Sequence, residues 1–77
     1  SYTFTGSDLL VPQQLFDDGK QTYFLYPQGQ VPPAIFSVNE KGQEIPVPVN
    51  MSNQYLTATG IYSRLILRKD GTFACVY

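Results

Sequence analysis

The 77-residue sequence contains no histidine and a single cysteine, Cys75. The absence of histidine excludes Ser-His-Asp and Cys-His catalysis, and it excludes zinc sites built on histidine or on several cysteines. A single cysteine also excludes a disulfide within the chain. Most enzyme classes are therefore implausible on residue types alone. We expect no catalytic residues, no metal site and no cofactor.

The sequence also lacks long apolar runs and a strong net charge. No apolar stretch approaches the ~20 residues of a membrane span, and no signal-peptide pattern opens the chain. Five basic and six acidic residues give a net charge of −1. The basic stretch with Arg64, Arg68 and Lys69 is interpreted as the solvated face of a strand, with a docking surface for an acidic partner as the alternative. We expect neither a nucleic-acid partner nor a transmembrane segment.

Length and composition favour one small folded domain over residues 1–77. Hydrophobic residues make up 43% of the chain and charged residues 14%, which argues against a disordered acidic tail. A domain of this size buries only about 60% of the surface of its unfolded chain, so its margin of stability is small. Because no internal disulfide can form, we expect a partner chain or a longer parent protein to supplement it.

Turn signals at short intervals predict an all-β chain. Asp18-Gly19, Lys41-Gly42 and Asp70-Gly71 each separate runs of alternating apolar and polar residues. Such dipeptides favour hairpins because glycine adopts positive φ without a steric penalty. No segment repeats its apolar residues with a helical period. The pattern predicts a small antiparallel β-sandwich, or a partly open barrel, of about eight strands at residues 2–6, 13–17, 21–26, 34–39, 44–50, 55–60, 62–68 and 73–77.

Two of these segments are predicted to be sheet edges of opposite kinds. In residues 44–50, Pro46 and Pro48 remove hydrogen-bond donors from the same side of the strand, which predicts an edge protected against further pairing. Residues 2–6 carry no proline and no charge. An unprotected edge of this kind accepts a strand from another chain, with main-chain hydrogen bonds giving affinity.

Asp17, Asp18 and Cys75 each have an interpretation as chemically active residues and a simpler, structural one. Asp17 and Asp18 are of the type used in acid–base or calcium chemistry, but their place before a glycine favours turn formation. Cys75 shares one face of the predicted strand 73–77 with Phe73 and Tyr77. It is interpreted first as a small hydrophobe of the core, and second as the partner in an interchain disulfide.

Six tyrosines and five phenylalanines make the chain rich in aromatic residues. Core packing and one protein interface are the favoured uses for a small sandwich without disulfides. The alternative is a carbohydrate-type ligand-binding module that stacks sugars on Tyr23, Tyr26, Tyr55 or Tyr62. That alternative requires two or three of these rings to be exposed and coplanar.

Several segments together resemble one protein family. Residues 16–24, FDDGKQTYF, resemble its FDDG-x-x-TYF signature, and residues 33–36, PAIF, follow in the family's order. The opening YTFTG, the run 64–68 before a hairpin and the closing ACVY are also similar. On these motifs the chain resembles the C-terminal domain of the TrbG/VirB/CagX family, outer-membrane-associated core subunits of type IV secretion systems.

The resemblance implies a small β-sandwich from a longer exported protein of a Gram-negative bacterium. Its implied place is the periplasm, at the outer membrane, in a homo-oligomeric ring that serves conjugation or effector export. The implied partners are a segment of a small outer-membrane lipoprotein, which adds a strand to the domain and so anchors the core complex, and a TrbI-type subunit that forms the channel. None of these roles is enzymatic.

Position by position, the resemblance places the lipoprotein segment on the strand at residues 2–6. The expected partner-binding residues are those of this strand and of the apolar run after it: Tyr2, Thr3, Phe4, Thr5, Gly6, Leu9, Leu10 and Val11. Proline at Thr3 or Thr5 is expected to weaken binding by removing a donor at the open edge. Some family members link to the lipoprotein by a disulfide, which makes Cys75 a candidate for that bond.

Overall fold

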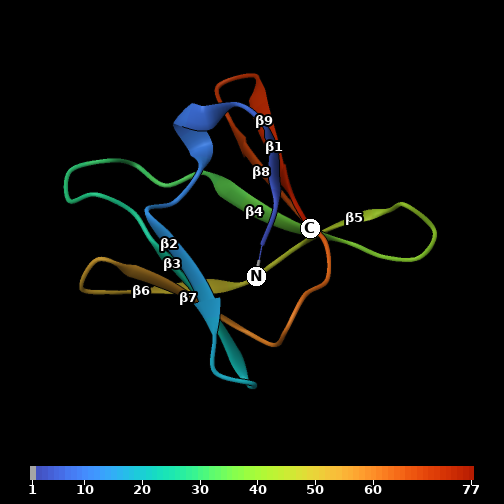
Figure 1. Ribbon diagram of the computed structural model, residues 1–77, viewed down its shortest axis with the longest axis horizontal. Coiled ribbons are helices and arrows are strands. Elements are labelled where there is room, and N and C mark those ends of the chain that lie inside the picture. Colours follow the sequence, from blue (N-terminus) through green and yellow to red (C-terminus); the bar gives the residue numbers. More distant parts are fainter. Residues whose placement is uncertain (1) are drawn as a thin grey trace.

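The computed structural model describes residues 2–77 and consists of nine short strands and one turn of 3-10 helix (Figure 1). Along the chain the elements are β1 (Phe4–Gly6), η1 (Asp8–Leu10), β2 (Gln14–Asp17), β3 (Gln21–Leu25), β4 (Ala34–Val38), β5 (Glu44–Pro46), β6 (Val49–Ser52), β7 (Tyr55–Thr59), β8 (Leu65–Lys69) and β9 (Thr72–Val76).

The strands form two antiparallel sheets. Sheet A has five strands in the order β1-β9-β8-β4-β5, and sheet B has four strands in the order β2-β3-β7-β6. The predicted all-β antiparallel sandwich is therefore confirmed. Because β1 pairs with β9, the two ends of the chain lie close together, as Figure 1 shows.

The three predicted hairpins all form, but their turns differ in detail. Asp70 and Gly71, between β8 and β9, both have positive φ, as a two-residue turn requires. Between β2 and β3, the Asp18 N–H donates to the Gln21 carbonyl at 3.1 Å, so this turn is centred one residue later than predicted. A fourth hairpin, between β6 and β7, was not predicted. It turns at Asn53, with a φ of 57° that asparagine tolerates.

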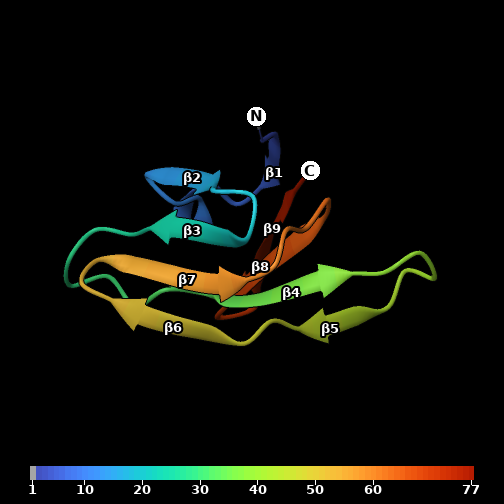
Figure 2. The same ribbon diagram turned by 90° about the horizontal axis from the view of Figure 1, so that it is seen from below.

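The segment predicted as one strand at residues 44–50 is two strands. Figure 2 shows β5 and β6 following one another along the lower side of the molecule, and they belong to different sheets: β5 pairs with β4, and β6 with β7. The Val47 N–H donates to the Ile35 carbonyl at 2.9 Å. Because main-chain groups alternate in an antiparallel ladder, the nitrogen of Pro46 faces away from β4. The proline therefore costs no ladder bond, and the predicted edge is confirmed at both strands.

The strand predicted at residues 62–68 begins only at Leu65. Before it, the Tyr62 hydroxyl donates to the Thr59 carbonyl at 2.7 Å, so the chain makes a loop there. Leu65 and Leu67 are buried between the sheets, while Arg68 lies on the outer face of sheet A.

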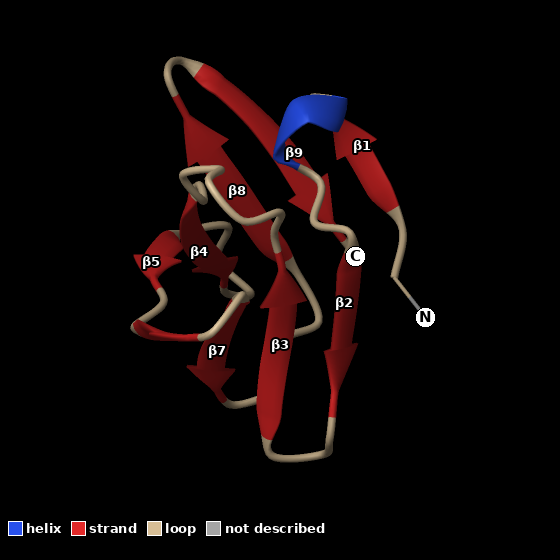
Figure 3. Cartoon of the chain, turned by 90° about the vertical axis from the view of Figure 1, so that its left-hand side faces the viewer, coloured by secondary structure: helices blue, strands red, loops and turns tan. Residues whose placement is uncertain are grey.

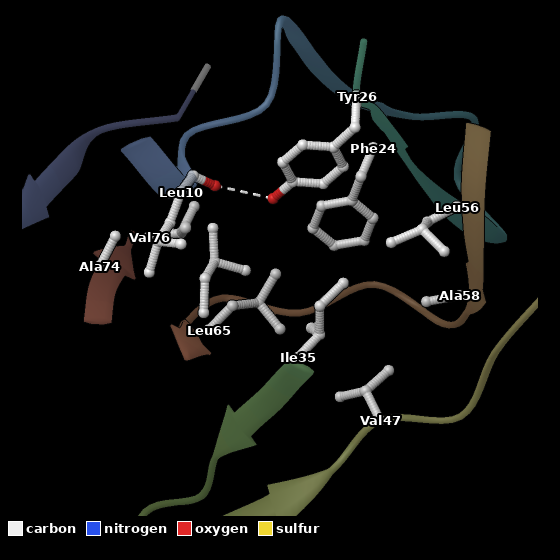
Figure 4. Packing of buried hydrophobic residues seen from close by; sticks show 11 residues of the cluster. Leu10, Phe24, Tyr26, Ile35, Val47, Leu56, Ala58, Leu65, Ala74 and Val76 are labelled. Carbon is white, nitrogen blue, oxygen red and sulfur yellow. Dashed lines mark hydrogen bonds between the residues drawn. The ribbon is translucent and has the colours of Figure 1, made fainter. Parts of the chain in front are cut away.

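The core fills the space between the sheets and is almost wholly apolar. Figure 4 shows its side chains, of which Phe24 and Tyr26 are the largest: Leu10, Phe24, Tyr26, Ile35, Val47, Leu56, Ala58, Leu65, Leu67, Ala74 and Val76. The Tyr26 hydroxyl donates to the Leu10 carbonyl at 2.8 Å, which satisfies its polar end inside the core. Burial raises the pKa of Tyr26, so the hydroxyl keeps its proton and remains a donor.

Candidate functional site

Strand β1 lies at one edge of sheet A, and its pairing decides which main-chain groups are free. Thr3 and Tyr77 exchange two hydrogen bonds, at 3.0 and 2.9 Å, and the Ser7 N–H donates to Phe73. Main-chain groups alternate in direction along an antiparallel strand. Those of Phe4, and of every second residue from it, therefore point away from β9. The open edge of sheet A therefore presents the N–H and C=O of Phe4.

This register corrects the expectation for proline substitutions. The N–H of Thr3 donates to β9, not to the open side, and Thr5 faces β9 in the same way. Proline at either position would break the pairing of β1 with β9 instead of removing a free donor. The position whose nitrogen faces outward is Phe4.

Gly6 allows β1 to approach β9 closely at its far end. Its φ is +99°, a conformation that residues with a side chain rarely adopt. A Cβ at this position would lie 2.6 Å from the Phe73 carbonyl oxygen and 3.0 Å from the Ala74 Cα. Both are main-chain atoms, so a change of side-chain conformation cannot relieve the clash. Only glycine fits here without displacing β1.

A groove runs between β1 and the edge of sheet B formed by β2. Figure 3 shows these two strands along the same side of the molecule. The groove has a volume of about 500 Å³ and is lined by Tyr2, Phe4, Pro12, Gln13, Gln14, Leu15, Phe16 and Asp17. Phe4 and Leu15 also pack against the core, so they form an apolar floor. Such a groove can hold an extended segment, with its main chain on a strand edge and its apolar side chains on the floor.

The sequence predicts the β1 side of this groove but not the β2 side. The signal was present, because residues 13–17 were predicted as a strand with Leu15 between polar or exposed neighbours. What the sequence does not contain is the sheet order that places the β2 edge opposite β1.

The apolar run after β1 divides into residues with different roles. Leu10 is 4% exposed and belongs to the chain's own core, so its side chain is not available to a partner. Leu9 on the same helical turn is 79% exposed, and Val11 is half-buried. The expected partner surface is therefore corrected to exclude Leu10, and Leu9 stays in it.

One hydrogen bond crosses from the first strand to the end of β2. The Tyr2 hydroxyl donates to Asp17 Oδ2 at 3.0 Å, while Asp17 Oδ1 accepts from the Gly19 N–H at 3.0 Å. Partial burial and the hydrogen bond to this carboxylate raise the pKa of Tyr2. The Asp17 carboxylate thus holds Tyr2 beside the groove. Asp17 is also the charged residue among those that line the groove.

Asp18 is a turn former, as the sequence analysis expected. Its carboxylate accepts hydrogen bonds from the Gln21 N–H at 2.7 Å, the Tyr23 hydroxyl at 2.7 Å and the Lys20 N–H at 2.9 Å. These bonds stabilise the charged form and lower the pKa of Asp18 to about 2. Within residues 2–77, no three acidic or cysteine side chains are grouped so that they could hold a metal ion.

Cys75 does not lie in the core, which corrects the first interpretation of this residue. In β9 the buried residues are Ala74 and Val76, so Cys75 faces the outside of sheet A and is half-buried. Its neighbours on that face of the strand are Phe73 and Tyr77, 49% and 48% exposed. The thiol is free in this structure and remains a candidate for an interchain disulfide.

The basic residues on the same face interact within the chain. Arg68 makes a bidentate ion pair with Glu44, at 2.9 and 2.7 Å, and its guanidinium lies 5.4 Å from the centre of the Phe73 ring. Arg64 lies 5.7 Å from the centre of the Tyr77 ring. These contacts agree with the interpretation of a solvated strand face.

The aromatic side chains do not form the platform that sugar binding requires. The rings of Phe16 and Tyr23 stack on each other at 5.0 Å, and Tyr55 is almost perpendicular to Tyr23, at 88°. Tyr26 is 2% exposed. A second hollow of about 320 Å³ adjoins Tyr26 and is lined largely by side-chain amides. The requirement for exposed coplanar rings is not met by this arrangement.

The fold and the groove define a small antiparallel β-sandwich with an unprotected sheet edge. Within residues 2–77, no helix is long and apolar enough to cross a membrane. The chain belongs to the CagX family of conjugal transfer proteins, whose family model matches residues 1–77. The resemblance stated from the sequence motifs is thereby confirmed.

Three curated relatives are similar to this chain, and two of them are named type IV secretion system proteins. The chain is 30% identical over 77 residues to the type IV secretion system protein VirB9 of Bartonella quintana, covering 100% of this chain and 27% of that protein. It is 36% identical over 67 residues to the type IV secretion system protein PtlF of Bordetella pertussis, covering 87% and 24%. It is 28% identical over 76 residues to protein VirB9 of Agrobacterium fabrum, covering 99% and 26%. The chain therefore spans about a quarter of the length of these relatives.

Proposed function

We propose that this chain is a structural interaction module of a type IV secretion system. In this proposal the groove between β1 and β2 binds an extended segment of a small outer-membrane lipoprotein by strand addition. The observation that carries the proposal is the open edge of β1, where the main chain of Phe4 faces the groove. The family and the names of its relatives support the wider setting.

The chemistry of the groove favours a segment of alternating character. A strand laid along β1 would direct every second side chain towards the floor formed by Phe4 and Leu15. Among the eight lining residues, all of them within residues 2–77, Asp17 alone is charged. A neutral or basic segment with alternate apolar residues would therefore bind better than an acidic one.

The wider assembly follows from the same proposal. The domain, residues 1–77, would belong to a longer exported protein of a Gram-negative bacterium and would lie in the periplasm at the outer membrane. Bound lipoprotein would anchor a ring of copies there, beside a TrbI-type channel subunit, in a system for conjugation or effector export. The proposed role is structural; the family is described as conjugal transfer proteins, and two of the relatives are named type IV secretion system proteins.

An NMR titration tests the proposal. The ¹⁵N-labelled chain is titrated with a peptide covering the extended segment of the cognate lipoprotein, and with a scrambled peptide as a control. We expect large shifts on residues 2–6, on Leu9 and on residues 12–17, with new protection of the Phe4 amide. An unchanged spectrum would remove the lipoprotein-binding role from this chain.

A pair of variants tests whether the peptide binds in the groove. Phe4→Ala removes part of the apolar floor and is expected to weaken binding about tenfold or more, because burial of a large apolar side chain contributes about 1.5–3 kcal/mol. Thr57→Ala, on the outer face of sheet B, is the control and should leave the affinity unchanged. Each variant's own spectrum shows whether the fold is retained. Equal affinities for both variants would place the binding site elsewhere.

A further inference from the structure

The two sides of the sandwich are closed by different means. On one side, the nine residues from Glu44 to Ser52 pair first with β4 of sheet A and then with β7 of sheet B. Val47 lies at the crossing and is buried. One nearly continuous segment therefore joins both sheets along the lower side of Figure 2. On the opposite side, where β1 and β2 lie, no strand within residues 2–77 joins the two edges.

The second edge of the groove has the same free groups as the first. The Asp18 N–H donates to the Gln21 carbonyl at 3.1 Å, which continues the register of Phe16 with Tyr23 and Gln14 with Leu25. Gln13 lies before β2 and outside this register, and its N–H donates to the Leu25 carbonyl at 2.7 Å. With the register Leu15 to Phe24, the alternation of the ladder directs the N–H and C=O of Leu15 away from β3. Both edges thus present free main-chain groups at the residue whose side chain forms the groove floor.

We propose that the segment bound in the groove forms hydrogen bonds with both β1 and β2. It would join sheet A to sheet B as residues 44–52 do on the other side, and it would convert the open sandwich into a closed barrel. The inference rests on the proposed function, and it adds to it that the second half of the site is the main chain of β2. The fitting partner is a single extended segment whose two main-chain edges are both used, with apolar side chains placed between Phe4 and Leu15.

This arrangement explains why the groove has an apolar floor but open walls. A strand bound to β1 alone would leave its own outer edge unpaired beside the unpaired edge of β2. A strand bound to both edges satisfies the donors and acceptors of Phe4 and Leu15 together, and it covers the floor between them. Pro12, just before β2, also lines the groove.

Couplings across hydrogen bonds test the inference directly. The ¹⁵N-labelled chain is bound to the lipoprotein peptide labelled with ¹³C, and scalar couplings from chain nitrogens to peptide carbonyl carbons are measured. Couplings from both Phe4 and Leu15 are expected. Couplings from Phe4 without Leu15 would overturn the double pairing and leave strand addition intact. Absence of binding would overturn the proposed function itself.

A matched pair of variants gives a second test. Leu15→Ala removes the side chain and keeps the outward N–H, whereas Leu15→Pro removes both, without costing a bond between β2 and β3. If the N–H is used, the proline variant binds the peptide about 2- to 13-fold more weakly than the alanine variant, the effect of one net hydrogen bond. Equal affinities in two folded variants would overturn the inference. If the proline variant does not fold, the coupling measurement decides alone.

Discussion

The β5–β6 side and the β1–β2 side of this sandwich deal with their sheet edges in opposite ways. On the β5–β6 side, Pro46 directs its nitrogen outward, where a donor would otherwise be free, and Pro48 follows within the crossing segment. On the β1–β2 side, Phe4 and Leu15 present free main-chain groups above an apolar groove. Proteins usually protect such edges against unwanted pairing. The contrast supports the proposal that the open side binds a partner.

On the open side, η1 and β1 connect the chain to the core and to sheet A. The turn η1 covers the end of the core there by inserting Leu10, whose carbonyl accepts the hydrogen bond from Tyr26. Strand β1, on the same side, has three residues and pairs with β9. The predictions below test whether this side is stabilised by a few identifiable groups.

The largest effect is expected at Leu10. Leu10→Ala removes a buried side chain from the core and should lower the free energy of unfolding by about 2–5 kcal/mol. A chain of this size has a total stability of about 4–12 kcal/mol, so the variant loses a large share of it. Chemical denaturation followed by circular dichroism measures the change.

Leu9→Ala is the matched control for this prediction. The neighbouring leucine is 79% exposed, so its loss should change the free energy of unfolding by less than about 0.5 kcal/mol. The same variant is expected to weaken binding of the lipoprotein peptide. Similar destabilisation by the two variants would show that η1 does not cover the core as described.

The next effect is expected at Gly6, which fixes β1 to β9. Gly6→Ala introduces a Cβ that would lie 2.6 Å from the Phe73 carbonyl oxygen, in addition to the strain of positive φ. We expect a loss of about 1–3 kcal/mol in the free energy of unfolding. Amide exchange should show it first in residues 3–7, because β1 would separate from its neighbour.

Gly19→Ala separates the clash from the backbone strain. Gly19 has a φ of +88°, but a Cβ there would have no atom within 4 Å. Its variant should therefore lose only about 1 kcal/mol, and residues 3–7 should keep their protection. An equal loss in both variants would mean that strain alone, and not the approach of β1 to β9, requires the glycine.

The sequence predicts features that depend on neighbouring residues, and it does not predict features that depend on how distant segments pair. The edge at Pro46 follows from the chemistry of one residue type, and three of the four hairpins follow from the glycines at their turns. The crossing between sheets at Val47 does not follow from the sequence pattern. The alternation of residues 44–50 is the same whether the strand stays in one sheet or changes sheets. The division into two strands is set by the pairing of β5 with β4 and of β6 with β7.

The candidate site shows the same limit. The alternation in β9 puts Cys75 on one face with Phe73 and Tyr77, but it does not say which face is the core. The large aromatic rings favoured the wrong choice, because here they lie outside, beneath arginine side chains. Likewise, the groove exists because residues at opposite ends of the chain, such as Phe4 and Val76, pair and bring β1 near β2.

The smallest effect is a dependence of stability on pH from Asp18, at the hairpin that ends β2. Hydrogen bonds from Gln21, Tyr23 and Lys20 lower its pKa from the usual 3.8 to about 2 in the folded chain. Between these values the unfolded chain binds the proton and the folded chain does not. The contribution is therefore fully present above about pH 4, and it is lost as the pH falls towards 2.

The variant Asp18→Asn isolates this contribution. Asparagine keeps a side-chain carbonyl for the main-chain bonds of the turn but cannot titrate. Denaturation curves between pH 5 and 2 should show a smaller decrease for the variant than for the parent chain, and the difference should vanish at the acid end. Parallel curves for the two proteins would mean that the pKa of Asp18 is the same in the folded and the unfolded chain. The hairpin of β2, and with it one wall of the groove, would then depend on its main-chain bonds alone.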